Sequence, residues 1–309
     1  MSKPRIAILG IFVADLAFRA KRLPVVGETL MGEGFAMGPG GKGSNQSVAA
    51  ARAGGEVSFI TRIGRDTFGD IALKTWGAAG IDTSQVAFSD TAPTGAAFIF
   101  VSSETGDNAI IVETGASSTI TPEYVSASEA TIRQAKVFIT QLETSVAAGR
   151  RGLELARKHN VITIFNPAPA AKIDPTIYAL CDYVTPNETE VEAITGIAVH
   201  SLDDARRAGD AVLKLGTKTA LITLGANGVL LHDKDQSVHV PTYKVKVVET
   251  TGAGDAFNGA FAVAIGEGRS PVDAARFGCA TAALSVTKAG TAPSMPMRTE
   301  IEAMMAAVG

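Results

Sequence analysis

Apolar residues recur along the chain in two alternating patterns. Short runs rich in β-branched residues are separated by longer stretches in which apolar residues return every three to four positions. The first pattern is typical of buried strands and the second of amphipathic helices. The short runs predict strands at residues 5–9, 57–60, 137–140, 161–165, 183–185 and 220–223. The longer stretches predict helices at residues 44–53, 68–79, 147–158, 202–215, 256–265 and 271–286. Because strands and helices alternate, we expect an α/β fold with a doubly wound, mainly parallel sheet.

Two stretches, at about residues 16–36 and 95–112, interrupt this alternation. In the second, two apolar runs flank the polar turn at residues 103–108, which predicts a β-hairpin. Strands that no helix follows cannot easily join a parallel sheet. We therefore expect both stretches to form a small separate sheet that acts as a lid over the ligand cleft.

The composition is that of a globular protein. Hydrophobic residues make up 46% and charged residues 19% of the 309 residues, and no run approaches the ~18 consecutive apolar residues that would span a bilayer. The length allows two domains, or one large α/β domain with an appendage. The apolar run at residues 6–14 is interrupted by Gly10 and ends at Asp15, which is typical of a buried first strand and not of a signal peptide. We therefore expect a cytoplasmic protein.

Charge and cysteine content narrow the choice of partner. The net charge of −3 gives no basic footprint for nucleic acid or for an anionic membrane. The two cysteines, Cys181 and Cys279, lack metal-ligand or redox spacing, so we expect two buried thiols and neither a disulfide scaffold nor a zinc site. The expected partner is a small molecule.

The most informative motif is the glycine-rich turn at residues 251–255, which enters an apolar helix. Gly252 and Gly254 can adopt positive φ and admit a ligand to the backbone, and the helix start offers unpaired N–H groups to an anion. Asp255 places a carboxylate in the same first turn. A carboxylate beside bound phosphate makes sense as the base that deprotonates an attacking hydroxyl. The motif therefore predicts phosphoryl transfer.

A second glycine-rich stretch, residues 38–43, leads into the helix that contains Asn45. An ordinary flexible loop with Ser44 as the helix N-cap is an equally simple interpretation. The alternative is a sugar site, because Lys42 and Asn45 can both hydrogen-bond a polyhydroxylated ligand. Neither glycine cluster matches a Walker A motif, since Gly43 follows Lys42, or a G-x-G-x-x-G motif, since Phe257 occupies the third glycine position.

Two further motifs follow predicted strands. Asn187 and Glu190 have the spacing of a helix capping box, and the same two groups can serve a phosphate and a water-held magnesium ion. Residues 223–228 read as strand, turn and strand, with a plain hairpin as the simplest interpretation and contact with a nucleotide as the other. Four residues fall at or after the carboxyl ends of main strands, where open α/β sheets bind ligands: Asp15, Glu143, Asn166 and Thr223.

Taken together and in this order, these motifs resemble the PfkB, or ribokinase-like, carbohydrate kinase family over nearly the whole chain. Residues 141–143, 166–170 and 186–190 are most similar to the ribokinases within it. The resemblance implies one three-layer α/β domain over residues 1–309 with a small β-sheet lid, commonly a homodimer through the lids. It also implies an ATP-dependent kinase that phosphorylates a sugar hydroxyl, as in the conversion of D-ribose to D-ribose 5-phosphate.

The resemblance also implies roles for individual positions. It makes Asp255 the base and the backbone of Gly252, Ala253 and Gly254 an anion hole. The sugar would lie against Val13, Asp15, Gly41, Lys42, Asn45, Glu143 and Asp255. ATP would contact Asn187, Thr223, Gly225, Ala226, Gly228, Gly254 and the start of the helix near Cys279. Glu190 would lie near Mg²⁺ and bind it through water. A K⁺ ion would be held, largely through backbone oxygens, by Glu249, Thr251, Ser285, Lys288, Gly290 and Ser294.

Two departures from the ribokinase pattern leave alternatives open. Val13 stands where ribokinases usually have an asparagine that helps to hold the sugar, and valine cannot hydrogen-bond a hydroxyl. The acceptor can therefore be ribose, a related sugar, or another sugar, polyol or nucleoside. Glu249 replaces a more usual aspartate and is one methylene longer, which can change the ion preference. From other classes, a non-catalytic sugar or nucleotide sensor and a dehydrogenase are disfavoured, the first by Asp255 and the second by the missing dinucleotide motif.

Overall fold

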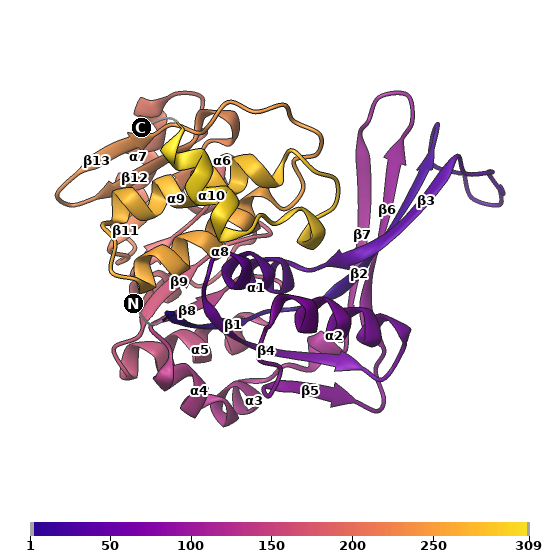
Figure 1. The fold of residues 1–309 in the computed structure, drawn as a ribbon, viewed down its shortest axis with the longest axis horizontal. Helices are drawn as coiled ribbons and strands as arrows, with labels where there is room; N and C mark the ends of the chain where they lie inside the picture. Colours follow the sequence, from indigo (N-terminus) through magenta and orange to yellow (C-terminus); the bar gives the residue numbers. More distant parts are fainter. Residues whose placement is uncertain (1–2, 308–309) are drawn as a thin grey trace.

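The computed structural model describes residues 3–307, and within this range nine strands form one large sheet (Figure 1). The spatial order from one edge to the other is β13 (Ser237–Val240), β12 (Val229–Asp233), β11 (Thr219–Thr223), β10 (Tyr183–Val184), β9 (Ile162–Phe165), β8 (Val137–Thr140), β1 (Arg5–Leu9), β4 (Glu56–Gly64) and β5 (Val86–Ser89). All neighbours from β11 to β5 pair in parallel, and β12 and β13 add an antiparallel edge. The expected mainly parallel sheet is confirmed.

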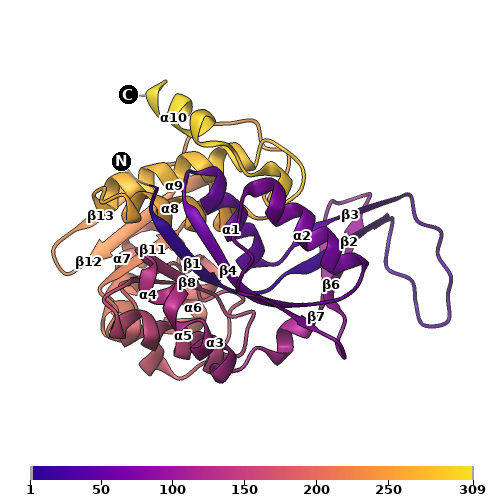
Figure 2. The same ribbon diagram turned by 60° about the horizontal axis from the view of Figure 1, so that its bottom comes forward.

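Helices cover both faces of this sheet and make three layers (Figure 2). One face carries α1 (Lys42–Arg52), α2 (Thr67–Ala79), α8 (Ala253–Gly266), α9 (Pro271–Ser285) and α10 (Arg298–Ala306). The other carries α3 (Pro122–Ala127), α4 (Glu129–Gln134), α5 (Val146–Lys158), α6 (Glu188–Thr195) and α7 (Leu202–Leu213). Successive side chains of β1 alternate between the two cores: Ile6 and Ile8 pack with the first group, Ala7 and Leu9 with the second. This burial on both faces explains why the strands read as continuous apolar runs.

A second sheet projects from the side of the molecule (Figure 1). Its order is β3 (Gly34–Gly40), β2 (Val13–Ala20), β6 (Thr94–Ser102) and β7 (Asn108–Gly115). The predicted hairpin is confirmed as the antiparallel pair β6 and β7, and β2 pairs in parallel with β6. The strands extend beyond the expected limits of 16–36 and 95–112, since β2 begins at Val13 and β7 ends at Gly115.

The glycine-rich stretch before α1 is not the ordinary flexible loop that was one of its two interpretations. Gly38 and Gly40 belong to β3, where they pair with Asp15 and Val13 of β2. The carboxylate of Asp15 lies directly over Gly40, in the space that a Cβ atom would need. Glycine is used here for close approach within a strand, and only Gly41 turns the chain, with φ of 88°, into the helix. No helix among the described residues is both long enough and apolar enough to cross a membrane.

Candidate functional site

Two helix N-termini meet beside the carboxyl ends of the central strands. The N-cap of α1 is Gly41, and the N-cap of α8 is Gly252 in the left-handed conformation with φ of 83°. Ser44 is not the N-cap: it lies inside α1, and its hydroxyl accepts a hydrogen bond of 2.9 Å from the indole of Trp76. The exposed residue Gly254 lies in the first turn of α8. The start of α8 is the better suited of the two to an anion, because in α1 the N–H of Lys42 donates to Glu143 and that of Ser44 to the carbonyl of Ile11.

Asp255 lies in the first turn of α8 and is only 6% exposed. Its two carboxylate oxygens accept hydrogen bonds from Asn45 Nδ2, at 3.0 Å, and from Gln46 Nε2, at 3.1 Å. Burial raises the pKa of Asp255, whereas nearby Lys42 and the two amide donors act in the opposite direction. A buried carboxylate that keeps strong hydrogen-bond partners is suited to exchanging a proton with a ligand hydroxyl.

Two more carboxylates face the same site. The backbone N–H of Lys42 donates a 2.7 Å hydrogen bond to Glu143 Oε2, and burial raises the pKa of Glu143 to about 7. Burial, followed by the charges of Glu249 and Asp255, raises the pKa of Asp15 to about 6. The expectation that Asp15 ends a main strand is wrong: it is the third residue of β2 in the small sheet. The structure nonetheless brings Asp15, Lys42 and Glu143 to the Asp255 site.

Val13 begins β2 two residues before Asp15 and is 4% exposed. It packs in a small apolar cluster with Ile11, Ala97 and Ile99. The chain next to Asp15 is therefore apolar at position 13.

The predicted capping box at the start of α6 is confirmed. Glu190 Oε2 accepts from the backbone N–H of Asn187, and Asn187 Oδ1 accepts from that of Glu190, both at 2.8 Å. Glu190 is 7% exposed, and burial raises its pKa. Asn187 also bridges to Thr223 at the end of β11, so the α6 start lies beside the β11–β12 turn.

The turn after β11 has the expected strand, turn and strand form. Gly225, Ala226 and Asn227 form a 3₁₀ turn between the antiparallel strands β11 and β12, and Gly225 and Ala226 are exposed. Gly228 has φ of 88° and packs so closely against the carbonyl of Val240 that no Cβ fits. The turn thus offers exposed backbone held in a fixed shape.

The helix predicted at residues 271–286 is confirmed, whereas the start of a helix near Cys279, implied by the resemblance, is wrong. The helix α9 starts at Pro271, and Cys279 lies in its middle with 3% exposure. Burial raises the pKa of this thiol to about 12. Both cysteines are buried and free, as expected, so Cys279 contributes packing and no helix N-terminus.

The residues expected around a monovalent cation lie in two segments that the fold brings together. Glu249 Oε2 accepts a 2.9 Å hydrogen bond from the N–H of Gly290, and the N–H of Val248 donates to the carbonyl of Val286 at 2.8 Å. The side chain of Lys288 turns away to Glu300, at 3.0 Å. Backbone oxygens and Ser or Thr hydroxyls therefore dominate this region, which is the chemistry that a hard cation prefers. Its members are Glu249, Thr251, Ser285, Lys288, Gly290 and Ser294, of which Ser285 and Ser294 are buried.

Several buried polar residues behind Asp255 were not singled out from the sequence. Gln46, Gln141, Thr185 and Asn258 are each at most 2% exposed and hydrogen-bonded to one another or to Asn166. One signal was available: Asn45 and Gln46 follow a glycine turn and precede an apolar helix, where a pair of amide side chains is unusual. Gln141 was noted only as part of the stretch 141–143 in the family resemblance, and Thr185 and Asn258 carry no comparable local signal.

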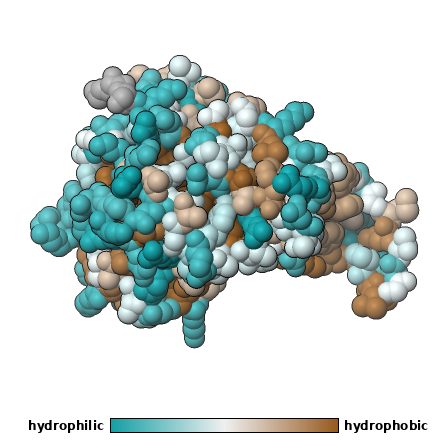
Figure 3. All heavy atoms as spheres, turned by 90° about the horizontal axis from the view of Figure 1, so that it is seen from below, coloured by the Kyte–Doolittle hydropathy of each residue, from teal (hydrophilic) through white to brown (hydrophobic). Residues whose placement is uncertain are grey.

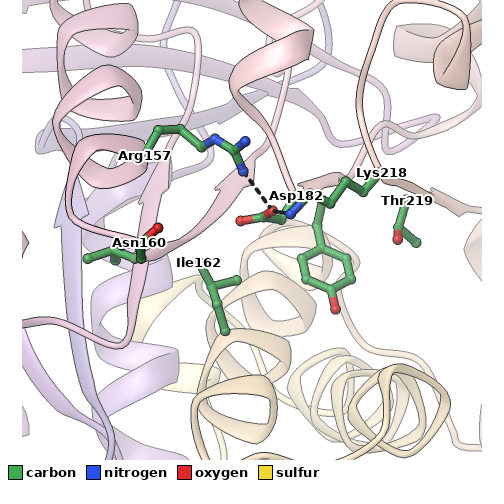
Figure 4. A pocket seen from close by; sticks show the side chains of 8 residues that line it. Arg157, Asn160, Ile162, Asp182, Lys218 and Thr219 are labelled. Atoms are coloured by element: carbon green, nitrogen blue, oxygen red, sulfur yellow. Dashed lines mark hydrogen bonds and ion pairs between the residues drawn. The ribbon is translucent and has the colours of Figure 1, made fainter.

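Two surface cavities lie away from this site. The first is on the opposite side of the sheet's strand ends. It has a volume of about 450 Å³ and is lined by Arg157, Asn160, Asp182 and Lys218 near the opposite ends of β9, β10 and β11 (Figure 4). Arg157 and Lys218 both pair with Asp182, at 3.2 and 2.6 Å. A second cavity, of about 780 Å³, lies between the loop after β13, α9 and α10. None of the residues predicted for the site lines either cavity.

Comparisons with known proteins agree with this geometry. The model of the pfkB family carbohydrate kinases matches residues 3–298. A ribokinase of Haemophilus influenzae is 39% identical over 295 residues, with 96% of each chain covered. A deoxyribokinase of Salmonella typhi is 35% identical over 292 residues, covering 94% of this chain and 95% of the relative. The structure of Arabidopsis thaliana ribokinase complexed with ribose and ATP superposes with a TM-score of 0.93 at 30% identity, covering 99% of both chains.

Proposed function

The chain belongs to the pfkB family of carbohydrate kinases, and we propose that it transfers the γ-phosphoryl group of ATP to a hydroxyl of ribose or a closely related sugar. The observation that carries this proposal is Asp255, a buried carboxylate in the first turn of α8 directly after the Gly252 turn. Family membership makes the chain a phosphotransferase with an alcohol group as acceptor.

The chemistry follows from the position of Asp255. Its carboxylate takes the proton of the sugar hydroxyl as the hydroxyl oxygen forms a bond to the γ-phosphorus, and the bond from that phosphorus to the bridging oxygen of ADP breaks. The N–H groups at the start of α8, from Gly252 to Gly254, then face the negative charge of the transferred group. The raised pKa of Asp255 favours its acceptance of the proton.

On the sugar side, the proposal rests on polar groups that converge next to Asp255. Asn45 donates through Nδ2 to Asp255, and its buried Oδ1 has no hydrogen-bond partner among the described residues. A sugar hydroxyl would satisfy that atom. Asp15 and Glu143 would accept hydrogen bonds from further hydroxyls, and Gly41 lets the ligand approach the backbone. The ammonium group of Lys42 sits among three carboxylates, and Asp255 foremost raises its pKa.

On the nucleotide side, we propose that ATP lies along the α8 N-terminus, Asn187 and the exposed Gly225–Ala226 turn, with Thr223 and Gly228 shaping that turn. Magnesium in phosphoryl-transfer sites is commonly held by one or two carboxylates, water and the substrate phosphates. Glu190, buried beside this region, would hold the ion through water. The ion would neutralise charge on the phosphates.

We also propose a monovalent cation next to the anion hole, held by the two segments around Glu249 and Gly290. Because Glu249 Oε2 accepts a hydrogen bond from the N–H of Gly290, the Glu249 side chain joins the two segments. It would also offer an oxygen to the ion. Potassium is the ion expected from the family resemblance.

The small sheet is proposed to act as a lid and as a dimer interface. Apolar side chains gather on this projecting part of the molecule (Figure 3). Its large exposed apolar residues are Phe18, Leu23, Val25, Val26, Met31, Phe35, Met37, Ile110, Ile111 and Val112. An exposed apolar surface on strands is typical of an interaction site. A second copy of the chain is the partner we propose, and the mass measured by analytical ultracentrifugation tests it.

We also propose that the protein acts in the cytoplasm, where ATP is supplied.

A second candidate acceptor is a sugar that lacks one of the ribose hydroxyls. The observation that favours it is Val13, which presents an apolar surface beside Asp15. One relative of this chain is named deoxyribokinase, so 2-deoxyribose is the sugar to compare with ribose. Another sugar, a polyol or a nucleoside is the broader alternative.

The experiment is a substrate panel with ATP, Mg²⁺ and K⁺, in which ADP release is coupled to an optical readout. Ribose, 2-deoxyribose, other pentoses, hexoses, polyols and nucleosides are compared by kcat/KM. Sugar-dependent ADP release with ribose or 2-deoxyribose as the best acceptor supports the proposal. Saturable sugar binding without ADP release would instead indicate the non-catalytic sensor.

A further inference from the structure

Behind Asp255 lies a closed ring of buried hydrogen bonds that no predicted role uses. Gln46 Nε2 donates both to Asp255 Oδ1 and to Asn166 Oδ1, at 3.1 Å each. Asn166 Nδ2 donates to the carbonyl of Thr185 at 3.0 Å. The Thr185 hydroxyl donates to Asn258 Oδ1 at 2.7 Å, and Asn258 Nδ2 donates to the carbonyl of Gly254 at 2.8 Å. Since Gly254 precedes Asp255, the ring returns to its start.

We propose that Gln46 is a positioning residue that holds the Asp255 carboxylate and, through this ring, keeps it in register with the Gly254 peptide of the anion hole. The inference rests on the proposed function, because it concerns how the base and the phosphate site of the kinase stay aligned. The elements joined are α1, α8 and the ends of β9 and β10, so four separate segments define one geometry.

The amide orientation of Gln46 is determined by its neighbours. Gln141 Nε2 donates to Gln46 Oε1 at 2.6 Å, so the Gln46 oxygen must face Gln141 and its nitrogen must face Asp255 and Asn166. A flipped amide would place an oxygen against the Asp255 carboxylate and two nitrogens against each other. Gln46 is 0% and Gln141 2% exposed, so bulk solvent does not reach this contact. The pair therefore holds one donor permanently toward the base.

Close helix packing fixes the backbone beneath this contact. The carbonyl of Gln46 would lie 2.5 Å from a Cβ at Gly259, so α1 and α8 touch through their backbones one turn beyond Asp255. Neither helix can slide without breaking the Gln46–Asp255 bond. A misplacement of about 1 Å in such a site costs on the order of a hundredfold in rate, which is why a group that never touches substrate can control turnover.

Other charged groups face Asp255 and must stay unchanged in a test of Gln46. They are Lys42 from α1, Asp15 from β2, Glu143 after β8 and Glu190 from α6. The substitution Gln46→Met keeps the length of the side chain and removes its hydrogen bonds without adding charge. Ser47→Ala is the matched control: it removes one buried side-chain hydrogen bond, from Ser47 to Gly43 at 2.7 Å, one position along the same helix.

The experiment measures kcat, the KM of each substrate and the pH profile of kcat for the parent chain and both variants. Gln46→Met should lower kcat by about tenfold to a hundredfold and leave the KM of ATP within about twofold. Its acidic limb should move to higher pH, since loss of the donor raises the pKa of Asp255. Ser47→Ala should match the parent both in kcat and in the pH of the acidic limb. Asn258→Leu, which breaks the ring without touching the carboxylate, should lower kcat and leave the acidic limb in place.

Different failures separate the two proposals. A parent chain that phosphorylates no sugar overturns the proposed function and this inference with it. The positioning role alone is overturned if the parent is active and Gln46→Met behaves like Ser47→Ala. That outcome means a kcat within about twofold of the control and an acidic limb of the pH profile at the same pH. If Gln46→Met does not fold, Gln46→Asn decides: it keeps an amide but is one methylene too short to hold both Asp255 and Asn166, and unchanged kcat and pH profile in that variant overturn the inference.

Discussion

The backbone N–H of Lys42 donates a 2.7 Å hydrogen bond to the carboxylate of Glu143, across 101 positions of sequence. This bond joins the first residue of α1 to the loop after β8 and holds both beside Asp255. Burial dominates at Glu143 and raises its pKa to about 7, although Lys42 and its N–H act in the opposite direction. The site therefore contains a carboxylate whose ionisation costs folding free energy.

Replacing this carboxylate should change stability in a pH-dependent way. The folded pKa of Glu143, about 7, lies above its ordinary value of 4.5, so the folded state holds a proton that the unfolded state loses earlier. The cost of ionising Glu143 is absent below pH 4.5 and grows as the pH rises to about 7. Glu143→Gln should therefore gain stability over the parent between pH 5 and 8, as measured by melting temperature.

Glu129→Gln is a control of opposite sign. Hydrogen bonds from Lys158 and His159 lower the pKa of the half-buried Glu129 to about 2. Its charge therefore favours folding above the ordinary carboxyl pKa, and the variant should lose rather than gain stability at neutral pH. A Glu143→Gln melting temperature that tracks the parent at every pH would contradict the raised pKa of Glu143.

Loss of the base should abolish most turnover without abolishing nucleotide binding. Asp255→Asn keeps the shape of the side chain but cannot accept the hydroxyl proton, so kcat should fall by about 10²–10⁴-fold. Calorimetry should give a nearly unchanged Kd for ATP. The control is Asp273→Asn, which changes the acidic residue in the first turn of α9, where Asp273 is half exposed and pairs with Arg276. Comparable kcat for Asp255→Asn and Asp273→Asn would contradict the role of Asp255 as the base.

The local patterns in this sequence were enough to predict the layers of the fold. β1 and β8 lie where their apolar runs predicted, because both faces of these strands are buried and their hydrophobicity is continuous. The small sheet was recognisable because no helix separates β2 from β3 or β6 from β7. Its extent was not, because Gly38 and Gly40 have low strand propensity and join β3 only through pairing with β2.

The candidate site was only partly predictable for a related reason. Asp255 and Asn45 lie next to glycine turns, and this local signal can be recognised in the sequence alone. The partners of Gln46, such as Gln141, are 95 positions away and are brought close only by the packing of α1 on the sheet. Cys279 shows the opposite error, since its position was carried over from a resemblance and the helix begins at Pro271.

The contact between α1 and α8 predicts a stability effect at Gly259. A methyl group at this helical position would lie 2.5 Å from the carbonyl of Gln46 and 2.7 Å from the Cβ of Ala49. Gly259→Ala should therefore destabilise the fold by about 1–3 kcal/mol, the usual cost of overpacking. Gly77→Ala is the control, because that helical glycine is exposed and a Cβ there meets nothing within 4 Å. It should stabilise by about 0.5–1 kcal/mol, and urea unfolding measures both.

The proposed cation site predicts a dependence of turnover on the monovalent ion. Replacing KCl by tetramethylammonium chloride at constant ionic strength should lower kcat, because the larger ion cannot fit among the oxygens near Glu249 and Gly290. Glu249→Ala should weaken the response to K⁺, since it also removes the 2.9 Å bond to the Gly290 N–H. Lys288→Ala serves as the control, because that side chain pairs with Glu300 on the surface. Equal kcat in both salts would contradict the site.

The apolar wall at Val13 predicts how sugar preference can be changed. Val13→Asn introduces an amide two residues before Asp15 on β2, where the parent offers only the surface shared with Ile11 and Ala97. One gained hydrogen bond to a hydroxyl is worth about 0.5–1.5 kcal/mol, so the ratio of kcat/KM for ribose over 2-deoxyribose should rise by about twofold to tenfold. Val13→Ala shortens the side chain without adding a polar group, and it should leave that ratio nearly unchanged. An equal rise in both variants would mean that space, and not hydrogen bonding at position 13, sets the choice of sugar.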